Sequence, residues 1–246
     1  MPADESRLER DGAEALALNA DMSRRVVIDS TRMPWQPSPS ATVWRKRLHL
    51  YGAAESAQVT SIVRYEAGAT FPAHDHPAGE EILVLHGVFS DEHGDWGRGC
   101  HLLNPEGFRH APFSQEGCVI FVKLQQYAGA GRRHQAVLSD TLERQPGDAA
   151  GIEVRLLYRQ RGFAEQIWME NWAAGTSVER CYPDGVEMLI IAGSLGEAGA
   201  VHGRGTWLRL PAGATTAWHS AGGCHLYLQS GAMPSLHSTA PEGWTG

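Results

Sequence analysis

The chain carries a weak internal repeat with a period near 106 residues, and this repeat constrains the fold more than any other feature of the sequence. Three short stretches recur at this one spacing. They are Arg98–Gly99 and Arg204–Gly205, Pro105–Gly107 and Pro211–Gly213, and Ser114–Cys118 and Ser220–Cys224. Repetition at this length predicts two similar small domains, because the repeating units of solenoid proteins are much shorter.

Both halves are predicted to consist of short strands. The 28 glycines and 13 prolines fit a turn-rich protein better than a helical bundle. We expect strands at Val59–Tyr65, Glu81–Phe89, Cys118–Gln126, Ile152–Gln160, Gln166–Trp172, Val186–Ala192, Thr206–Leu210 and Cys224–Gln229. From 118 to 124 the even positions are apolar, whereas Lys123 and Gln125 occupy odd positions. This alternation predicts an antiparallel sheet with one buried face.

Composition indicates where the domains divide. Residues 128–150 are polar and rich in glycine and arginine, which is typical of a connector. We expect an N-terminal tail with a short helix at 1–24, a first domain at 25–130 and a connector at 131–150. A second domain is expected at 151–233 and a loose C-terminal tail at 234–246.

Charge and hydropathy exclude several classes of protein. The formal net charge of -7 argues against an extended nucleic-acid surface, and we interpret the basic stretch at 44–47 as a solvated face. No run approaches the ~18 apolar residues of a membrane helix, and the N-terminus lacks the pattern of a secretory signal. The four cysteines are widely separated, as in proteins with reduced thiols. We expect a cytoplasmic protein that binds neither nucleic acid nor membranes.

Three histidines and a glutamate in the first half form a candidate metal site. His74 and His76 share one face of an extended strand, because side chains two residues apart point to the same side. The turn at Pro77–Gly79 would bring Glu80 beside them, and a second turn at Asn104–Gly107 would return the chain with His110. The pattern predicts one divalent metal ion held by these four side chains.

The alternative interpretation is that these histidines are scattered surface residues, since the chain contains 12. An HxH pair alone would not decide between the two interpretations, but the four-residue set favours the metal. Seven other histidines have no comparable neighbours, and we expect them to be solvated or locally hydrogen-bonded. They are His49, His93, His134, His202, His219, His225 and His237.

The second half has lost the metal-binding residues. Residues 67–70 match 174–177 at a spacing of 107, and residues 81–84 match 187–190 at 106, so one residue is missing in between. This alignment sets His74 opposite Cys181, His76 opposite Pro183 or its neighbour, Glu80 opposite Val186 and His110 opposite Thr216. A residual site from Cys181, Glu187 and His219 is the weaker interpretation. We expect the second domain to serve stability, dimerisation or a different ligand.

These motifs resemble those of the cupin superfamily. Gly68 followed by His74-x-His76-x3-Glu80 resembles its first motif, and Pro105-x-Gly107-x2-His110 resembles its second. Further strings are similar to the ChrR-like cupins in particular: Met33–Trp35, Trp44–Leu48, Thr60–Tyr65, Gly79–Leu85, Phe89–Glu92 and Glu116–Cys118. The resemblance covers about residues 25–127 and implies an all-β, double-lobed cupin with two antiparallel β-sandwich or jelly-roll barrels, the second degenerate.

The resemblance implies a sensory or regulatory role. ChrR is an anti-sigma factor whose cupin follows a zinc-binding helical domain; here no cysteine precedes Cys100, so sigma-factor binding is not supported. Four protein ligands would complete a tetrahedral zinc, which favours a closed sensory site. Cupins of this type also pair commonly, which implies a homodimer.

An enzyme is the alternative function. The same ligand set can hold iron, manganese or nickel with open positions, as in a dioxygenase that cleaves a small diketone or aromatic ketone. Four aromatic residues, Phe71, Trp96, Phe108 and Phe121, are candidates to line a pocket for such a small-molecule ligand, although ordinary core packing explains them better. In a third alternative the metal only stabilises the barrel.

Overall fold

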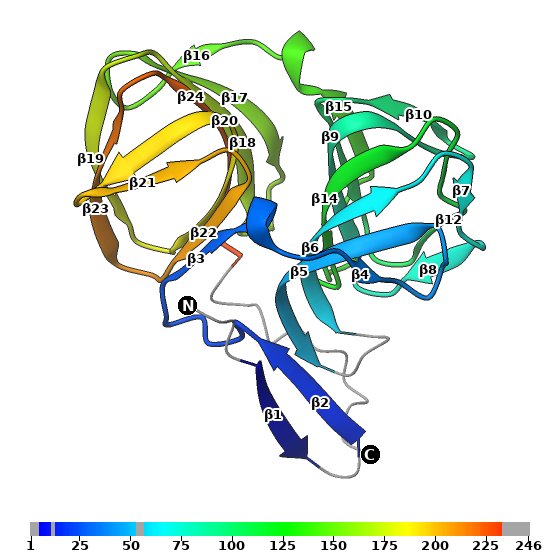
Figure 1. The fold of residues 1–246 in the computed structure, drawn as a ribbon. Helices are drawn as coiled ribbons and strands as arrows, with labels where there is room; N and C mark the ends of the chain where they lie inside the picture. The colour runs from blue at the N-terminus through cyan, green and yellow to red at the C-terminus, as the bar shows by residue number, and fades with distance from the viewer. Residues whose placement is uncertain (1–4, 11–12, 53–56, 233–246) are drawn as a thin grey trace. The chain divides into compact units, whose positions relative to one another are not determined.

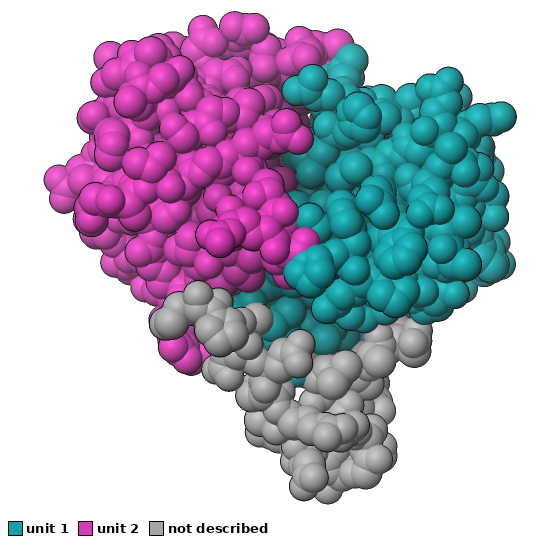
Figure 2. Space-filling model, viewed as in Figure 1, with its two compact units in different colours: residues 1–20, 34–138, 236–246 teal, residues 21–33, 139–235 magenta. Residues whose placement is uncertain are grey.

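The computed structural model describes residues 5–10, 13–52 and 57–232, and these are built almost entirely of antiparallel strands (Figure 1). They divide into two compact units (Figure 2). Within the described residues, unit 1 lies in Met1–Ala20 and Pro34–Leu138, and unit 2 lies in Asp21–Met33 and Ser139–Ser235. The predicted all-β fold is confirmed. No helix in the described ranges is long and apolar enough to cross a membrane.

Unit 1 contains a 12-stranded sheet whose main path runs β1-β2-β5-β6-β14-β9-β11-β15. These strands are β1 (Glu5–Arg10), β2 (Ala13–Leu18), β5 (Val43–Gly52), β6 (Gln58–Tyr65), β9 (Glu80–Asp91), β11 (Cys100–Asn104), β14 (Cys118–Leu124) and β15 (Gln135–Leu138). Shorter strands branch from this path: β4 (Gln36–Pro37), β7 (Ala69–Thr70), β10 (Gly94–Gly97) and β13 (Phe113–Ser114). A separate two-stranded sheet joins β8 (His74–His76) to β12 (Phe108–His110).

Unit 2 repeats this plan in a 10-stranded sheet with the main path β16-β17-β18-β24-β20-β22-β3. Its strands are β3 (Val26–Asp29), β16 (Gln145–Pro146), β17 (Ile152–Arg159), β18 (Gln166–Trp172), β19 (Thr176–Tyr182), β20 (Val186–Glu197), β21 (Ala200–Gly203), β22 (Thr206–Leu210), β23 (Ala214–Ser220) and β24 (Cys224–Ser230). Two 3-10 turns, η1 (Ser30–Arg32) and η2 (Ser139–Thr141), follow β3 and β15.

All eight strands expected from the sequence are present. The apolar residues at alternate positions of these strands form one core in each unit, with Ile82, Leu102 and Ile120 at the centre of the first. The largest difference is in β20, which continues to Glu197 although the apolar run ends near Ala192. Gly193 adopts a positive φ of 72° at this point, so β20 continues past a bulge in its pairing with β24.

The edge strand β3 of unit 2 lies outside the continuous segment that builds the rest of its sheet. β3 pairs with β22 at the edge of unit 2, and β15 pairs with β11 at the edge of unit 1. The units therefore divide differently from the predicted boundaries, and the predicted connector contains β15, η2 and β16. These strands are short and form by pairing with an existing sheet edge, which local sequence patterns do not reveal.

The short helix expected within residues 1–24 is wrong. β1 and β2 pair as an antiparallel hairpin, and β2 continues the sheet next to β5. Residues 13–18 have good helix formers, but pairing with β5 satisfies backbone groups that an isolated short helix would leave to water. The tail expected at 234–246 lies outside the described residues.

Strand β14 is buried on both faces over most of its length, whereas the sequence predicts one buried face. Lys123 is fully buried on the face expected to be polar, close to Glu81. Burial alone would raise the pKa of Glu81, but a hydrogen bond from His101 (3.0 Å) and the charges of His101 and Lys123 lower it. Tyr127 also donates to Glu81. Opposite charges and hydrogen bonds thus make burial of this polar face tolerable.

Strand pairing gives the correspondence between the two units. His110 pairs with His74 in unit 1, and Thr216 pairs with Arg180 in unit 2. Since His110 and Thr216 are one repeat apart, His74 corresponds to Arg180 and His76 to Tyr182, not to the predicted Cys181 and Pro183. The residue missing from unit 2 lies before the motif, in the stretch between β7 and β8.

Arg180 forms a buried ion pair that we expect to be important for the stability of unit 2. Its guanidinium donates to both carboxylate oxygens of Glu170, at 3.0 and 2.8 Å, and to Asp148 at 2.8 Å. Arg180→Ala should lower the free energy of unfolding by about 3–5 kcal/mol, because it leaves Glu170 as a buried, uncompensated charge.

Urea denaturation of both proteins would measure this loss. Arg144→Ala is the matched control, because its pair with Glu153 is exposed on both sides (58% and 51%). The control should lose less than about 1 kcal/mol. Equal losses in the two variants would contradict the importance of burial.

Candidate metal centre

Two short strands and one turn bring the predicted metal-binding residues together. β8 and β12 pair antiparallel, with His110 opposite His74 and Phe108 opposite His76. The turn before β9 is closed by a hydrogen bond from the Gly79 amide to the His76 carbonyl (3.1 Å). Gly79 has a φ of +72°, and a side chain there would meet the Asn104 carbonyl oxygen at 2.8 Å. The glycine therefore allows the tight turn that places Glu80 beside the histidines.

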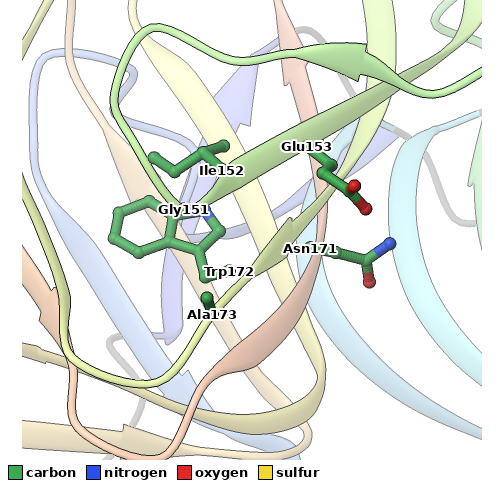
Figure 3. Close-up of a pocket in the computed structure, with 6 residues that line it drawn as sticks. All are labelled: Gly151, Ile152, Glu153, Asn171, Trp172 and Ala173. Atoms are coloured by element: carbon green, nitrogen blue, oxygen red, sulfur yellow. The ribbon is translucent and has the colours of Figure 1, made fainter.

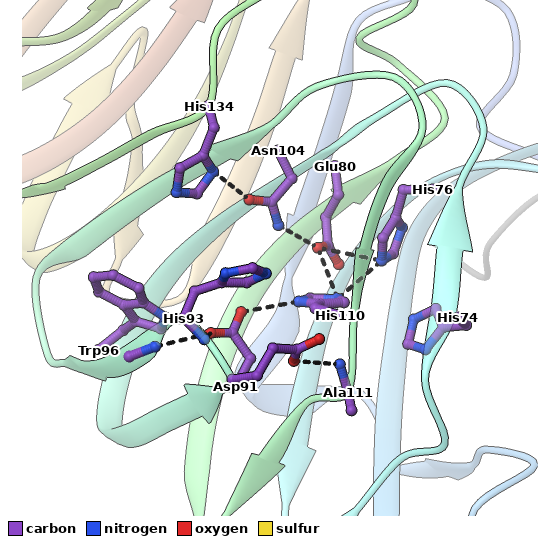
Figure 4. Close-up of polar contacts among 12 residues, drawn as sticks. His74, His76, Glu80, Asp91, His93, Trp96, Asn104, His110, Ala111 and His134 are labelled. Atoms are coloured by element: carbon purple, nitrogen blue, oxygen red, sulfur yellow. Dashed lines mark hydrogen bonds and ion pairs between the residues drawn. The ribbon is translucent and has the colours of Figure 1, made fainter.

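The nitrogen and oxygen atoms of these side chains face one another (Figure 4). The Nε2 atoms of His76 and His110 are 3.0 Å apart. Glu80 Oε2 lies 3.5 Å from the first and 3.4 Å from the second. One ring nitrogen from each of His74, His76 and His110 falls within a group whose atoms are all within 4.8 Å of one another. His76, Glu80 and His110 are buried, whereas His74 is half-buried.

His74, His110 and Glu80 are each oriented by a hydrogen bond to a residue outside the cluster. His74 donates from Nδ1 to the Pro72 carbonyl (2.9 Å), and His110 pairs through Nδ1 with Asp91 (3.1 Å). The Asn104 amide donates to Glu80 Oε2 (2.9 Å). Because Nδ1 of His74 and His110 is engaged outward, Nε2 of each presents a lone pair to the cluster. Outward contacts of this kind hold metal-binding histidines in place.

Electrostatics distinguishes the two buried histidines. Burial lowers the pKa of His76 below its ordinary value, with a smaller contribution from His110. Burial acts in the same direction on His110, but the hydrogen bond to Asp91 and the charge of Glu80 outweigh it and raise its pKa. Burial raises the pKa of Asp91, but hydrogen bonds from His110 and the His93 amide lower it overall, so Asp91 is an ionised partner for His110.

The donor set fits a divalent metal ion. Imidazole nitrogens and a carboxylate oxygen bind zinc, iron, manganese and nickel. Without a metal, one of the two Nε2 atoms of His76 and His110 must carry a proton for them to hydrogen-bond at 3.0 Å. A divalent metal would take the place of that proton and be neutralised in part by Glu80.

Three of the four aromatic candidates lie close to the cluster. Phe71 has its ring centroid 6.0 Å from that of His74, and Phe108 lies 5.7 Å from His110. Trp96 donates from its indole nitrogen to Asp91 (3.4 Å). Phe121 is different: it is 1% exposed and lies on the opposite face of β14 from the core residues Ile120 and Val122. Phe121 therefore lies outside the site.

Sequence reasoning missed the residues that surround the cluster. Asp91 and Asn104 each contact one member of the cluster, and His134 contacts Asn104 (3.1 Å). The strings that contain Asp91 and Asn104 do not indicate these contacts, because strands β9, β11 and β15 bring the residues together only in the folded sheet. Among the histidines set aside, His202 is locally hydrogen-bonded to Glu197 (2.9 Å), as expected. His237 lies outside the described residues.

Unit 2 does not rebuild the cluster. Arg180, Tyr182, Val186 and Thr216 stand at the four corresponding positions. Cys181 and His219 are exposed whereas Glu187 is buried, and among the described residues the His74, His76 and His110 group alone could hold a metal. The residual site considered for the second half is therefore not supported. A surface hollow of about 430 Å³ does occur in unit 2, lined by Gly151, Ile152, Glu153, Asn171, Trp172 and Ala173 (Figure 3). It lacks histidine and cysteine.

Asn104 is expected to tune metal affinity through Glu80. It is fully buried, and the corresponding residue of unit 2 is Leu210, so a leucine can occupy this place in the fold. Asn104→Leu would remove the donor to Glu80 and weaken metal binding by about 10–100-fold. Competition with a chromophoric chelator measures this change. An affinity equal to that of the unmodified protein would show that Glu80 needs no support.

Two antiparallel β-sandwich units, one of which brings three histidines together on paired strands, have the fold of cupins. Residues 23–128 match the family model described as the ChrR cupin-like domain. This part of the chain is therefore a cupin domain similar to that of ChrR. No curated protein matches the chain.

Solved structures of similar fold extend over both units. A candidate dioxygenase from Nostoc punctiforme aligns with a TM-score of 0.69 and 14% identity, over 84% of this chain and 82% of that one. Pirin YhhW from Escherichia coli, in complex with nickel(II), aligns at 0.64 and 12% identity, over 84% and 98%. A mutant oxalate decarboxylase OxdC from Bacillus subtilis aligns at 0.56 and 12% identity, over 83% and 76%. At these identities the similarity concerns the fold.

Proposed function

We propose that this protein binds one divalent metal ion through His74, His76, Glu80 and His110, and that the bound metal has a sensory or regulatory role. The observation that carries the proposal is the convergence of donor atoms from three separate strands, with Nε2 of His76, Nε2 of His110 and Glu80 Oε2 within 3.5 Å of one another. Charge supports it, because Glu80 and nearby Asp91 would balance a dication.

Zinc is the metal that we propose. Zinc prefers nitrogen and oxygen ligands in a four-coordinate arrangement, and it binds more tightly than iron or manganese at a given set of such ligands. The outward hydrogen bonds of His74, His110 and Glu80 favour a fixed set of four protein ligands. A site closed in this way leaves no coordination position for a substrate.

The regulatory role rests on the similarity of residues 23–128 to the ChrR cupin-like domain. When bound, the metal supplies a positive charge that ties β8, β9 and β12 together. A sensed molecule would reach the metal from the side of His74, because this half-buried ligand is the one most accessible from solvent. The His74 ring lies next to the half-buried Phe71.

A metal-dependent dioxygenase is the second candidate, and the 3.0 Å separation of the two Nε2 atoms favours it. Two nitrogens at about 2.1 Å from a metal are about 3.0 Å apart at a right angle and about 3.4 Å apart at a tetrahedral angle. Right-angle ligands are typical of octahedral iron, manganese or nickel, and a metal of this kind held by the four side chains would have further coordination positions for a substrate.

Metal loading and oxygen uptake, measured on one preparation, separate the two functions. Metal-free protein would be loaded with zinc(II) or iron(II) and incubated with diketones and hydroxylated aromatic ketones in an oxygen electrode. The regulatory proposal predicts one tightly bound zinc per chain and no oxygen uptake with either metal. Oxygen uptake by the iron(II) protein, lost in His76→Ala, would replace it with the dioxygenase.

A further inference from the structure

A series of hydrogen bonds leads from His134, the residue before the edge strand β15, to the candidate metal ligand Glu80. His134 Nδ1 lies 3.1 Å from Asn104 Oδ1, and Asn104 Nδ2 donates to Glu80 Oε2 at 2.9 Å (Figure 4). Both Asn104 and Glu80 are buried, whereas His134 is exposed. Glu80 is thus connected to the surface through two side chains.

The oxygen and the nitrogen of the Asn104 amide are chemically different, so the contact with His134 determines which of the two faces Glu80. An amide oxygen accepts and an amide nitrogen donates. When His134 donates from Nδ1 to the oxygen, the nitrogen is turned toward Glu80, where it stabilises the carboxylate. The reversed amide would place its oxygen against the carboxylate oxygen and leave both buried acceptors without a donor, which is costly.

His134 is held in place despite its exposure. Its ring stacks on Phe108 with the centroids 4.9 Å apart and the planes 9° from parallel. Its backbone is anchored because Gln135, the next residue, pairs with Leu103 at the start of β15. Stacking and strand pairing therefore fix both the position and the plane of this imidazole.

In unit 2 the residue before the edge strand also reaches a buried polar side chain, although at a different position, because the counterpart of Asn104 is Leu210. There Arg209 pairs with Val26, one repeat spacing away from the pairing of Leu103 with Gln135. The residue before Val26 is Arg25, which corresponds to His134, and Arg25 forms an ion pair with the buried Glu197. In both units the residue before the edge strand thus uses a side-chain nitrogen to contact a buried polar side chain.

We infer that His134 is a positioning residue for the metal centre, which orients Asn104 so that Glu80 is held in its metal-binding orientation. The inference rests on the proposed metal site. It also assigns a role to β15: the segment that leads out of unit 1 supplies part of the surroundings of the metal.

Cobalt(II) binding to the full chain tests the inference. His134→Phe keeps a flat ring to stack on Phe108 but removes the hydrogen bond to Asn104. We expect it to weaken cobalt(II) affinity by about 10–100-fold and to shift the visible absorption of the bound cobalt. The matched control is His93→Phe, because His93 packs against the same Phe108 ring (5.1 Å). The control should bind cobalt as the unmodified protein does.

A double-mutant cycle identifies the route of the effect. If His134 acts through Asn104, His134→Phe should cause less than about a twofold further loss in the Asn104→Leu background. A shift in the visible absorption of bound cobalt in His134→Phe, absent from His93→Phe, is the readout that a merely structural role would not produce.

Two outcomes would overturn the inference alone: unchanged cobalt affinity and spectrum in His134→Phe, or an equal loss in both backgrounds. A failure of the unmodified protein to bind cobalt would overturn the proposed metal site and this inference together.

Discussion

Replacing His76 by alanine is expected to abolish stoichiometric metal binding. His76 is 5% exposed, and its Nε2 faces both His110 (3.0 Å) and Glu80 (3.5 Å), so it lies at the centre of the donor set. A bound ligand stabilises the folded state by about 4 kcal/mol when its free concentration is about 1,000 times the dissociation constant. The unmodified protein should therefore melt at a higher temperature with zinc, and His76→Ala should not.

Melting curves recorded with and without added zinc measure this difference. His86→Ala is the matched control, since His86 is an exposed histidine on β9, the strand that also carries Glu80. The control should keep both its metal and its zinc-dependent rise in melting temperature. If His76→Ala gained as much from zinc as the control, the metal would bind elsewhere.

The Gly87→Ala variant is expected to be strongly destabilised. Gly87 has a φ of +71°, and a Cβ there would lie 2.1 Å from the Gly117 carbonyl oxygen and 2.9 Å from Cys118 Cα. Both neighbours are backbone atoms of the segment that pairs with Gly87, so no side-chain movement relieves the clash. Backbone strain and overpacking together should cost about 2–5 kcal/mol.

Thermal melting followed by circular dichroism would measure this loss. Gly97→Ala is the control, because a Cβ at Gly97 meets no atom within 4 Å. Gly193 in unit 2 has the same environment, with the Gly223 carbonyl at 2.1 Å, so Gly193→Ala should show a similar loss. If Gly87→Ala melted at the same temperature as the Gly97→Ala control, this would contradict the observed closeness of the two backbone segments.

The parts of the fold that local patterns control were predicted correctly. Strand β18 begins and ends at the expected residues Gln166 and Trp172, because a short segment rich in aliphatic and aromatic residues lies between glycine-containing turns. The candidate ligands His74 and His76 could be grouped because both lie in one short extended segment. The larger cupin architecture followed from the resemblance of these motifs and from the repeat.

The features that were missed depend on contacts between distant segments. Strand β15 exists because Gln135–Leu138 pairs with the edge of β11, which no pattern within 131–150 reveals. Lys123 appeared to be on a solvated face, but its burial depends on the carboxylate of Glu81 from another strand. Asn104 reaches Glu80 only because β11 and β9 pair with these residues opposite one another.

The register between the two units was also beyond the sequence. A single missing residue could be placed anywhere between the matched stretches, and only strand pairing places it before the motif. As a result, the counterparts of His74 and His76 are Arg180 and Tyr182. The first of these forms the buried ion pair with Glu170, so unit 2 has an ion pair at a position where unit 1 has a candidate metal ligand.

The metal content of the protein tests the central claim most directly. The full chain would be purified without chelators or added metal, and its metals would be measured by elemental mass spectrometry and normalised to protein. The account predicts about one divalent metal ion per chain, chiefly zinc. Metal far below one equivalent, not restored by adding zinc to the purified protein, would contradict it.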